Sequence, residues 1–314
     1  MENKRVFYAC QGLSYQGEPL RGVQNLSVRT ENNTNPVENW GSLGISGVYA
    51  DTPKTTITFS RVLSTGTIPI ATGTLESISK KHNNQLCLFI VGDTSEGVNP
   101  TPPTGMPPFR NVFFNNLSID SLSYSINIDG FLTEDVTMIG YSKQNDHSEC
   151  DITTMDFGAI HLPNDMPIRR QHMSSVSRGT KAISHDSVQS LNVSIPFGIQ
   201  TVEEFGVALS RDNERYRYPT LPIASTYSIT AIYQNASGFD NYMFSHNDIG
   251  CTHTSGLAQK ETLSFSTCNG GMAINFSNCI LNDIDYGGGD VDGGNAELTY
   301  NYTCYNEGTI SHGQ

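Results

Sequence analysis

The residues that most often carry catalytic chemistry are spread thinly along this chain. None of its eight histidines belongs to an H-E-x-x-H zinc pattern, and no serine lies in a G-x-S-x-G nucleophile motif. The histidines stand mainly in expected loops, at positions 82, 147, 161, 172, 185, 246, 253 and 312. Acid–base catalysis needs such groups gathered in one place. We therefore expect no enzyme, no catalytic residues and no cofactor.

One segment rich in glycine and aspartate, NDIDYGGGDVDGGN (residues 282–295), has the residue types of a calcium loop. It lacks the EF-hand spacing and occurs once, whereas glycine–aspartate calcium repeats need stacked neighbours. The favoured interpretation is a hairpin tip, in which glycines supply positive φ and Asp290 and Asp292 stay in solvent. We expect no metal site, and the sequence leaves calcium binding by this loop open.

The seven cysteines also carry little chemistry. They are scattered, form no C-x-x-C pair, and fall mostly in expected strands. The sequence therefore predicts neither a zinc site nor a redox motif, and we interpret the cysteines as small buried hydrophobic residues.

The charge balance limits the partners. The chain has 18 basic and 31 acidic residues and a net charge of −13, which disfavours static binding of nucleic acid or of anionic lipid. No stretch approaches the roughly 20 apolar residues that span a bilayer, and the start, MENKRVFYAC, lacks the apolar core of a signal peptide. We expect a chain made in a cytoplasm, with no membrane partner. The small basic run between Arg169 and Lys181 suits a face that meets an acidic neighbour, such as another copy.

Alternating apolar residues predict strands over 27–30, 56–62, 86–91 and 117–126. One short helix is expected over 73–82, capped near Thr74, with Leu75 and Ile78 on one face. The fold class is therefore mainly β, with a short helix packed outside.

The same blocks occur twice in the chain. GVQNLSV (22–28) returns as SVQSLNV (187–193), and further blocks follow in the same order: residues 56–58 match 228–230, 122–124 match 284–286, and 135–137 match 297–299. Fixed-register repetition of this kind predicts a tandem duplication. We expect a first domain over 1–145, a linker over 146–165 and a second domain over 166–314, each with a flanking helix.

A second pair of recurring elements gives the candidate structural residues. We expect them to do one task in both halves, either packing the helix on the sheet or meeting the next subunit, although plain core aromatics at Trp40 and Phe205 are an equal alternative. They are Val37, Glu38, Trp40 and Gly41 in the first half and Val202, Glu203, Phe205 and Gly206 in the second.

These short elements, together with the opening FYACQGL (7–13), resemble the tail tube proteins of tailed bacteriophages. The resemblance implies a β-sandwich or half-barrel with one flanking helix, whose copies join edge strands into a ring around a β-barrel channel. The duplication places the chain in the branch with two folds per chain and three chains per pseudo-hexameric ring. Rings then stack into a tube.

The resemblance also implies a location and partners. The protein is expected in the virion tail, made in the host cytoplasm, and assembled with itself and with tail initiator and terminator complexes. DNA passes through the acidic lumen without tight binding. A proline-rich segment without a counterpart in the second half is expected to be a contact loop; its candidates are Pro100, Pro102, Pro103, Pro107 and Pro108.

Two other function classes stay open at this stage. A carbohydrate-binding or receptor-binding β-sandwich of the virion would need exposed aromatics on loops, for which Tyr216, Tyr218 and Tyr242 are candidates. A hydrolytic enzyme on a β scaffold would need a clustered acid and base.

Overall fold

The computed structural model describes residues 11–32, 34–38, 44–50, 53–65, 67–90, 110–140, 144–145, 167–169, 172–178, 181–183, 188–202, 216–232, 260–268, 271–287 and 297–312. About three quarters of these residues lie in strands, so the mainly β prediction is confirmed. Seventeen strands form one antiparallel hydrogen-bonded network, and two further pairs, β4–β5 and β15–β16, stand as separate hairpins.

The first half of the chain supplies eleven strands. They are β1 (Gln11–Tyr15), β2 (Glu18–Pro19), β3 (Val23–Glu31), β4 (Thr34–Glu38), β5 (Ile45–Ala50), β6 (Lys54–Val62), β7 (Gly73–Thr74), β8 (Asn84–Ile90), β9 (Arg110–Asn127), β10 (Thr133–Gly140) and β11 (Gln144–Asn145). All four strands expected from the sequence lie within this set, in β3, β6, β8 and β9.

The second half supplies ten strands. They are β12 (Met173–Arg178), β13 (Lys181–Ile183), β14 (Val188–Pro196), β15 (Gln200–Val202), β16 (Tyr216–Tyr218), β17 (Ala224–Ile232), β18 (Glu261–Thr267), β19 (Met272–Gly287), β20 (Glu297–Tyr305) and β21 (Gly308–His312). The expected hairpin around residues 282–295 is present, because Gly287 at the end of β19 pairs with Glu297 at the start of β20. Asp290 and Asp292 lie outside the described residues.

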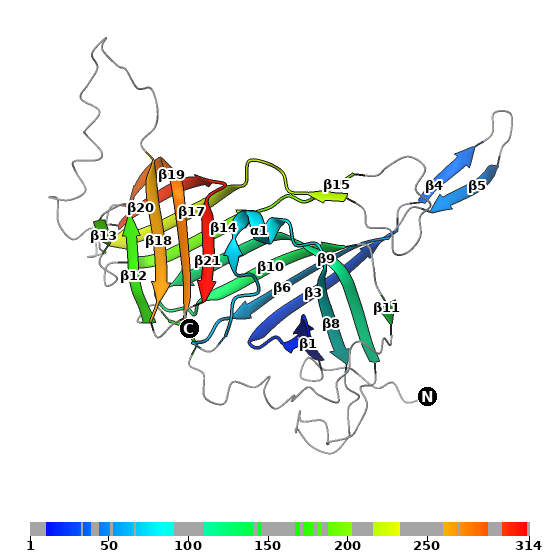
Figure 1. Cartoon of the computed structure of the whole chain (residues 1–314), viewed down its shortest axis with the longest axis horizontal. Coiled ribbons are helices and arrows are strands. Elements are labelled where there is room, and N and C mark those ends of the chain that lie inside the picture. The colour runs from blue at the N-terminus through cyan, green and yellow to red at the C-terminus, as the bar shows by residue number, and fades with distance from the viewer. Residues whose placement is uncertain are drawn as a thin grey trace, which may run out of the picture.

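Eight strands make a continuous central sheet that crosses the molecule (Figure 1). Their order is β3, β6, β10, β9, β14, β17, β20 and the second part of β19, all antiparallel. Strands β1 and β8 flank this sheet at one end, and β12, β18 and β21 at the other. The hairpin β4–β5 projects away from the body of the molecule.

Two long strands link the central sheet to the flanking strands, which explains why the strands form one network instead of two separate sheets. The first part of β9 pairs with β8 and its second part with β10 and β14. In the same way β19 pairs first with β18 and β21 and then with β20. Asn116 and Asn278 have positive φ at these two transitions, a conformation that asparagine tolerates better than most residues.

The only helix in the described part of the chain is α1 (Leu75–Ser79). Its predicted cap is confirmed, because the backbone N–H of Ser77 donates to Thr74 Oγ1 over 3.2 Å. Leu75 and Ile78 are buried, as expected for one apolar face. The helix ends before His82, earlier than predicted, because the polar run that begins at Lys80 has no apolar residue to continue the buried face.

A single core lies behind the central sheet and contains buried residues of both halves. Alternation along each strand sends one set of side chains into it, as in β6, where every second residue is buried. Residues after the expected linker join this core from the second half's side: Ile168 is buried, its N–H donates to the Leu63 carbonyl over 3.0 Å, and its carbonyl accepts from Leu132 N–H over 2.8 Å. The whole of the expected linker, residues 146–165, lies outside the described residues.

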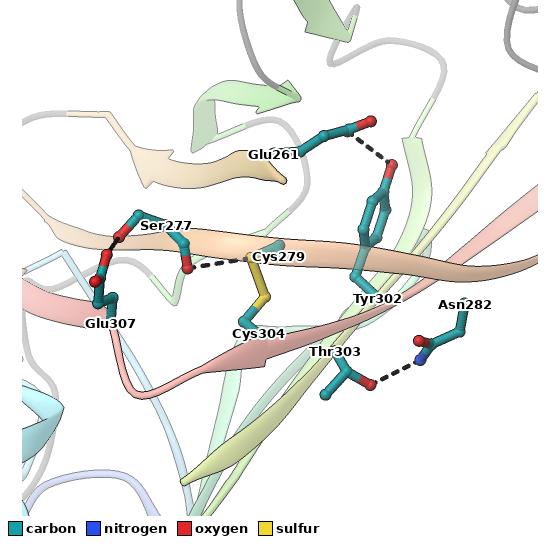
Figure 2. The surroundings of a disulfide bond; sticks show 8 residues. All are labelled: Glu261, Ser277, Cys279, Asn282, Tyr302, Thr303, Cys304 and Glu307. Carbon is teal, nitrogen blue, oxygen red and sulfur yellow. Dashed lines mark hydrogen bonds between the residues drawn. A yellow bond between two sulfur atoms is a disulfide. The ribbon is translucent and has the colours of Figure 1, made fainter. Parts of the chain in front are cut away.

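The interpretation of the cysteines as plain hydrophobic residues is wrong for three of them. Cys279 and Cys304 lie directly opposite each other on β19 and β20 and form a disulfide (Figure 2). Cys87 is disulfide-bonded as well, whereas Cys268 is a free thiol. The pairing was hidden in the sequence because it depends on the register of two strands, which brings together residues that are 25 positions apart.

Candidate assembly edges and polar face

The candidate structural residues predicted from the sequence do not come together in one place in the structure. Val37 lies in β4 with 51% of its side chain exposed, Glu38 ends the same strand, and Val202 ends β15 in a different hairpin. The other five residues of the two elements lie outside the described part, as do all five candidate prolines. Of the sugar-platform candidates, Tyr218 is 53% exposed, Tyr216 stands two residues before it in β16, and Tyr242 lies outside the described residues.

The central sheet has one face made almost wholly of hydroxyl and amide side chains. One ladder of directly opposite residues crosses seven strands from β3 to β20; its members are Asn25, Ser60, Asp135, Ser123, Ser194, Thr226 and Thr303. A second ladder runs through Thr133, Ser125, Asn192, Ser228, Asn301 and Asp283. None of these side chains is buried, although the residues between them along each strand face the core.

These polar side chains bind one another across the strands. Ser125 Oγ lies 2.8 Å from Thr133 Oγ1, and Ser228 Oγ donates to Asn301 Oδ1 over 2.8 Å. Asn301 Nδ2 in turn donates to Asp283 Oδ1 over 2.6 Å. Hydroxyl groups held by neighbours in this way leave a hydrated surface, and neither of the two ladders contains a cation.

The charges on this face are mainly acidic. Asp135, Asp283 and Asp285 lie on it, with no cation opposite them in the described ladders. The cations Arg29 and Lys54 stand at the far end of the β3–β6 pair, next to Glu31: Arg29 lies 2.8 Å from the Glu31 carboxylate, and Lys54 is directly opposite Glu31. Most of this face therefore presents acidic or uncharged groups to a polyanion, and the exposed cations Arg29 and Lys54 stand only at one end of it.

The central sheet ends in two open edges among the described pairings. β3 pairs on one side with β6, and the second part of β19 pairs on one side with β20. Apolar side chains at both edges are incompletely covered: Leu26 and Val28 on β3 and Ile284 on β19 are partly buried, while Tyr286 on β19 is 61% exposed. Open edges with apolar side chains are sites where another strand can pair.

The middle of the same sheet contains a junction between the two halves of the chain. There β9 pairs with β14, with Tyr124 opposite Val193 and Leu122 opposite Ile195. All four side chains are fully buried. At this junction strand pairing buries apolar side chains completely, whereas similar side chains at the two open edges stay partly exposed.

A buried polar cluster supports the junction from below. Tyr124 donates its hydroxyl to Glu134 Oε1 over 2.9 Å, the Arg61 guanidinium pairs with Glu134 Oε2, and the Ile70 N–H donates to Glu134 Oε1 over 3.0 Å. Burial, with the Glu134 charge beside it, holds the pKa of Tyr124 well above its ordinary value. The Glu134 carboxylate thereby ties the loop before α1 to the sheet.

The described residues bring no catalytic constellation together. A cleft of about 480 Å³ beside α1 is lined by groups such as Tyr15, Ser77, Lys80 and Lys81, without a histidine or carboxylate in its wall. No group of three potential metal ligands occurs within the described ranges. In that same part of the chain, no helix is long and apolar enough to cross a membrane.

Sequence reasoning missed the polar face and the two edges. A signal for the face was present, because serine, threonine or asparagine alternates with leucine or tyrosine in Ser121–Tyr124 and again in Thr299–Tyr302. The edges depend on strand order, which alternation does not reveal.

Comparison with known proteins adds no relative. No protein-family model matches the sequence, and no curated protein is significantly similar to it.

Proposed function

We propose that this protein is a structural subunit whose copies join side by side through β3 and β19 into closed rings. Stacked rings form a hollow tube, with the hydroxyl-rich face of the central sheet lining its lumen. The function proposed here is that of a phage tail tube, a conduit for DNA that does not bind it tightly. The observation that carries the proposal is the pair of open, partly apolar edges on a sheet whose internal junction buries similar apolar side chains.

The first support is the order of strand pairing, which recurs in the two halves. Strands β1, β8, β9, β10, β6 and β3 pair in this order, and so do β12, β18, β19, β20, β17 and β14. Asn116 and Asn278, the two non-glycine residues with positive φ in the described strands, take equivalent places in β9 and β19. A tandem duplication accounts for both facts.

Cross-strand partners fix the residue correspondence between the proposed copies. Leu26 lies opposite Phe59, and Leu191 opposite Ile229, so Phe59 corresponds to Ile229. This differs by two residues from the sequence match of 56–58 with 228–230. The next strand follows: Val136 lies opposite Phe59 and Tyr300 opposite Ile229, which moves the match of 135–137 with 297–299 by two residues as well.

The correspondence turns the internal junction into a template for joining two chains. Val28 of β3 corresponds to Val193, and Tyr286 of β19 corresponds to Tyr124. Because Val193 and Tyr124 are opposite each other and buried, Val28 of one copy is placed opposite Tyr286 of the next. Each pairing of this kind covers apolar area and satisfies the backbone groups of two edges.

Charge is complementary in the same alignment. Ser194 lies opposite Ser123 at the junction, and the corresponding residues at the open edges are Arg29 and Asp285. A chain joined in this register therefore places a guanidinium opposite a carboxylate. The pair sets the register of the contact more than its strength, since surface ion pairs contribute only about 0–1 kcal/mol.

A closed ring removes every open edge of the central sheet, and fusing two copies lowers the entropy cost because fewer bodies meet. Three chains per ring is the number that the tail tube resemblance implies; each chain contributes eight strands to the barrel and a charge of −13. With an acidic, hydroxyl-rich lumen, phosphate groups are repelled or left hydrated.

Electron microscopy of negatively stained protein over a concentration series tests this proposal. We expect rings with threefold end views at intermediate concentration and hollow tubes above it. Single particles of monomer size at every concentration contradict it. The alternative, a sugar-binding or receptor-binding module, predicts such discrete particles and a ligand that raises the melting temperature.

A further inference from the structure

We propose that the projecting β4–β5 hairpin docks on the bend of β19 in a second copy of this chain, and that a difference in polarity keeps this contact distinct from its counterpart within the chain. This inference rests on the proposed function and names the residues that select the partner.

The contact within the chain is formed by the β15–β16 hairpin and the bend of β9. Arg217 of β16 donates to the carbonyl of Asn116, the residue with positive φ, and to Ser118 Oγ over 2.8 Å. His82 Nδ1 lies 3.0 Å from the same hydroxyl. Arg217 and Ser118 are both buried, so the second half's hairpin is seated on the first half by a polar contact.

The β4–β5 hairpin is the counterpart of β15–β16 but has no such seat among the described residues of its own chain. Cross-strand partners give the match: Thr201 lies opposite Arg217, and Pro36 opposite Val48, so Val48 stands where the other hairpin has Arg217. Val48 is 63% exposed and Ile45 is 60% exposed. Two exposed large aliphatic side chains on a projecting hairpin indicate a contact surface.

The matching seat is the bend of β19. Asn278 corresponds to Asn116 and has the same positive φ, and Ile280 corresponds to Ser118. Ile280 is only partly buried, whereas Ser118, which accepts from Arg217 of the docked hairpin, is fully buried. The polar pair Arg217–Ser118 within the chain is thus replaced by the apolar pair Val48–Ile280. In a joined ring this seat belongs to the chain that also offers its β19 edge to β3.

The exchange of a polar for an apolar pair sets the order of the copies. Arg217 placed over Ile280 loses the hydroxyl acceptor of its buried guanidinium, and Val48 placed over Ser118 leaves that hydroxyl without the guanidinium. Each hairpin therefore favours one seat, and first and second halves must alternate around the ring.

The test uses two proteins, both with Cys268→Ser: one with Val48→Cys and the other with Ile280→Cys. They are mixed, assembled and treated with a short bismaleimide whose span matches an extended arginine side chain. A covalent dimer that contains one copy of each protein shows that the two cysteine positions lie within the crosslinker's reach across a contact between chains. Val37→Cys replaces Val48→Cys as the matched control, because Val37 is exposed on the opposite face of the same hairpin.

We expect several-fold more mixed dimer from the Val48 and Ile280 positions than from Val37 and Ile280. Sedimentation of the same mixtures shows whether rings form, which separates the test of ring assembly from the test of hairpin docking. Rings without selective coupling at Val48 overturn this inference and leave pairing through β3 and β19 intact. Proteins that stay monomeric overturn the proposed function and the inference together. As a second measurement, Val48→Arg should weaken assembly, and Ile280→Ser should restore part of it; an unaffected Val48→Arg protein also overturns the inference.

Discussion

Tyr286 gives the sharpest prediction, because its side chain is 61% exposed while its proposed counterpart Tyr124 is fully buried. A tyrosine buries about 150–250 Å² when fully covered, so the exposed part amounts to roughly 120 Å². At about 25 cal/mol per Å² this area stabilises each contact between chains by ~3 kcal/mol. Tyr286→Ser therefore weakens each contact by about 2–3 kcal/mol, or roughly 30-fold to 150-fold in its association constant.

Sedimentation velocity over a dilution series measures the concentration at which rings appear. We expect Tyr286→Ser to need a concentration higher by about one to two orders of magnitude, with an unchanged thermal unfolding temperature of the single chain, since substitutions of exposed residues rarely alter stability by more than ~0.5 kcal/mol.

Tyr218→Ser is the matched control. Tyr218 is 53% exposed but stands in the β15–β16 hairpin, whose strands belong to neither edge of the central sheet. Assembly should be unaffected by this change. If the Tyr286→Ser protein and the wild type assemble at the same concentration, Tyr286 is not buried in a contact between chains, and pairing through β19 is contradicted. A sugar ligand whose binding is lost only in the Tyr218→Ser protein would favour the binding-module alternative.

Three predictions concern stability. Arg61→Ala leaves the buried Glu134 carboxylate without its partner and should lower the free energy of unfolding in urea by about 3–5 kcal/mol, whereas Arg61→Ala with Glu134→Leu should lose clearly less; equal losses would contradict the pairing. Removing the Cys279–Cys304 disulfide by paired alanines should cost about 3 kcal/mol in the same assay, and a reducing agent should then have a smaller effect on the variant than on the wild type. Burial raises the pKa of Tyr15 from 10.0 to about 12, so its neutral form stabilises the fold below pH 10 and this contribution is lost as the pH rises toward 12; in Tyr15→Phe the decline over this range should be shallower, and an unchanged decline would count against the assignment.

Local features of the fold could be predicted from the sequence because they depend on near neighbours. Alternation placed β3, β6, β8 and β9, and Thr74 identified the start of the helix through a contact with Ser77 only three residues away. The repeated blocks also mark strands that share the same pairing order.

Contacts between distant segments could not be predicted in this way. The Arg61–Glu134 pair joins residues 73 positions apart, and the disulfide depends on the register of β19 against β20. Both follow from strand order, which a pattern within one strand does not specify. The open edges could not be predicted either, because they also depend on strand order. β9 pairs with β14 of the second half and not with β3, so β3 is left with β6 as its partner on one side.

In the proposed ring, one copy's β3 pairs with the next copy's β19 around a lumen lined by the hydroxyl-rich face. A cryo-electron microscopy reconstruction of the assembled particle at side-chain resolution tests it most directly. We expect Val28 opposite Tyr286 across each boundary between chains, with Ser123 and Asn301 facing the channel. A reconstruction in which β3 stays unpaired, or in which Ser123 and Asn301 face the outside, contradicts it.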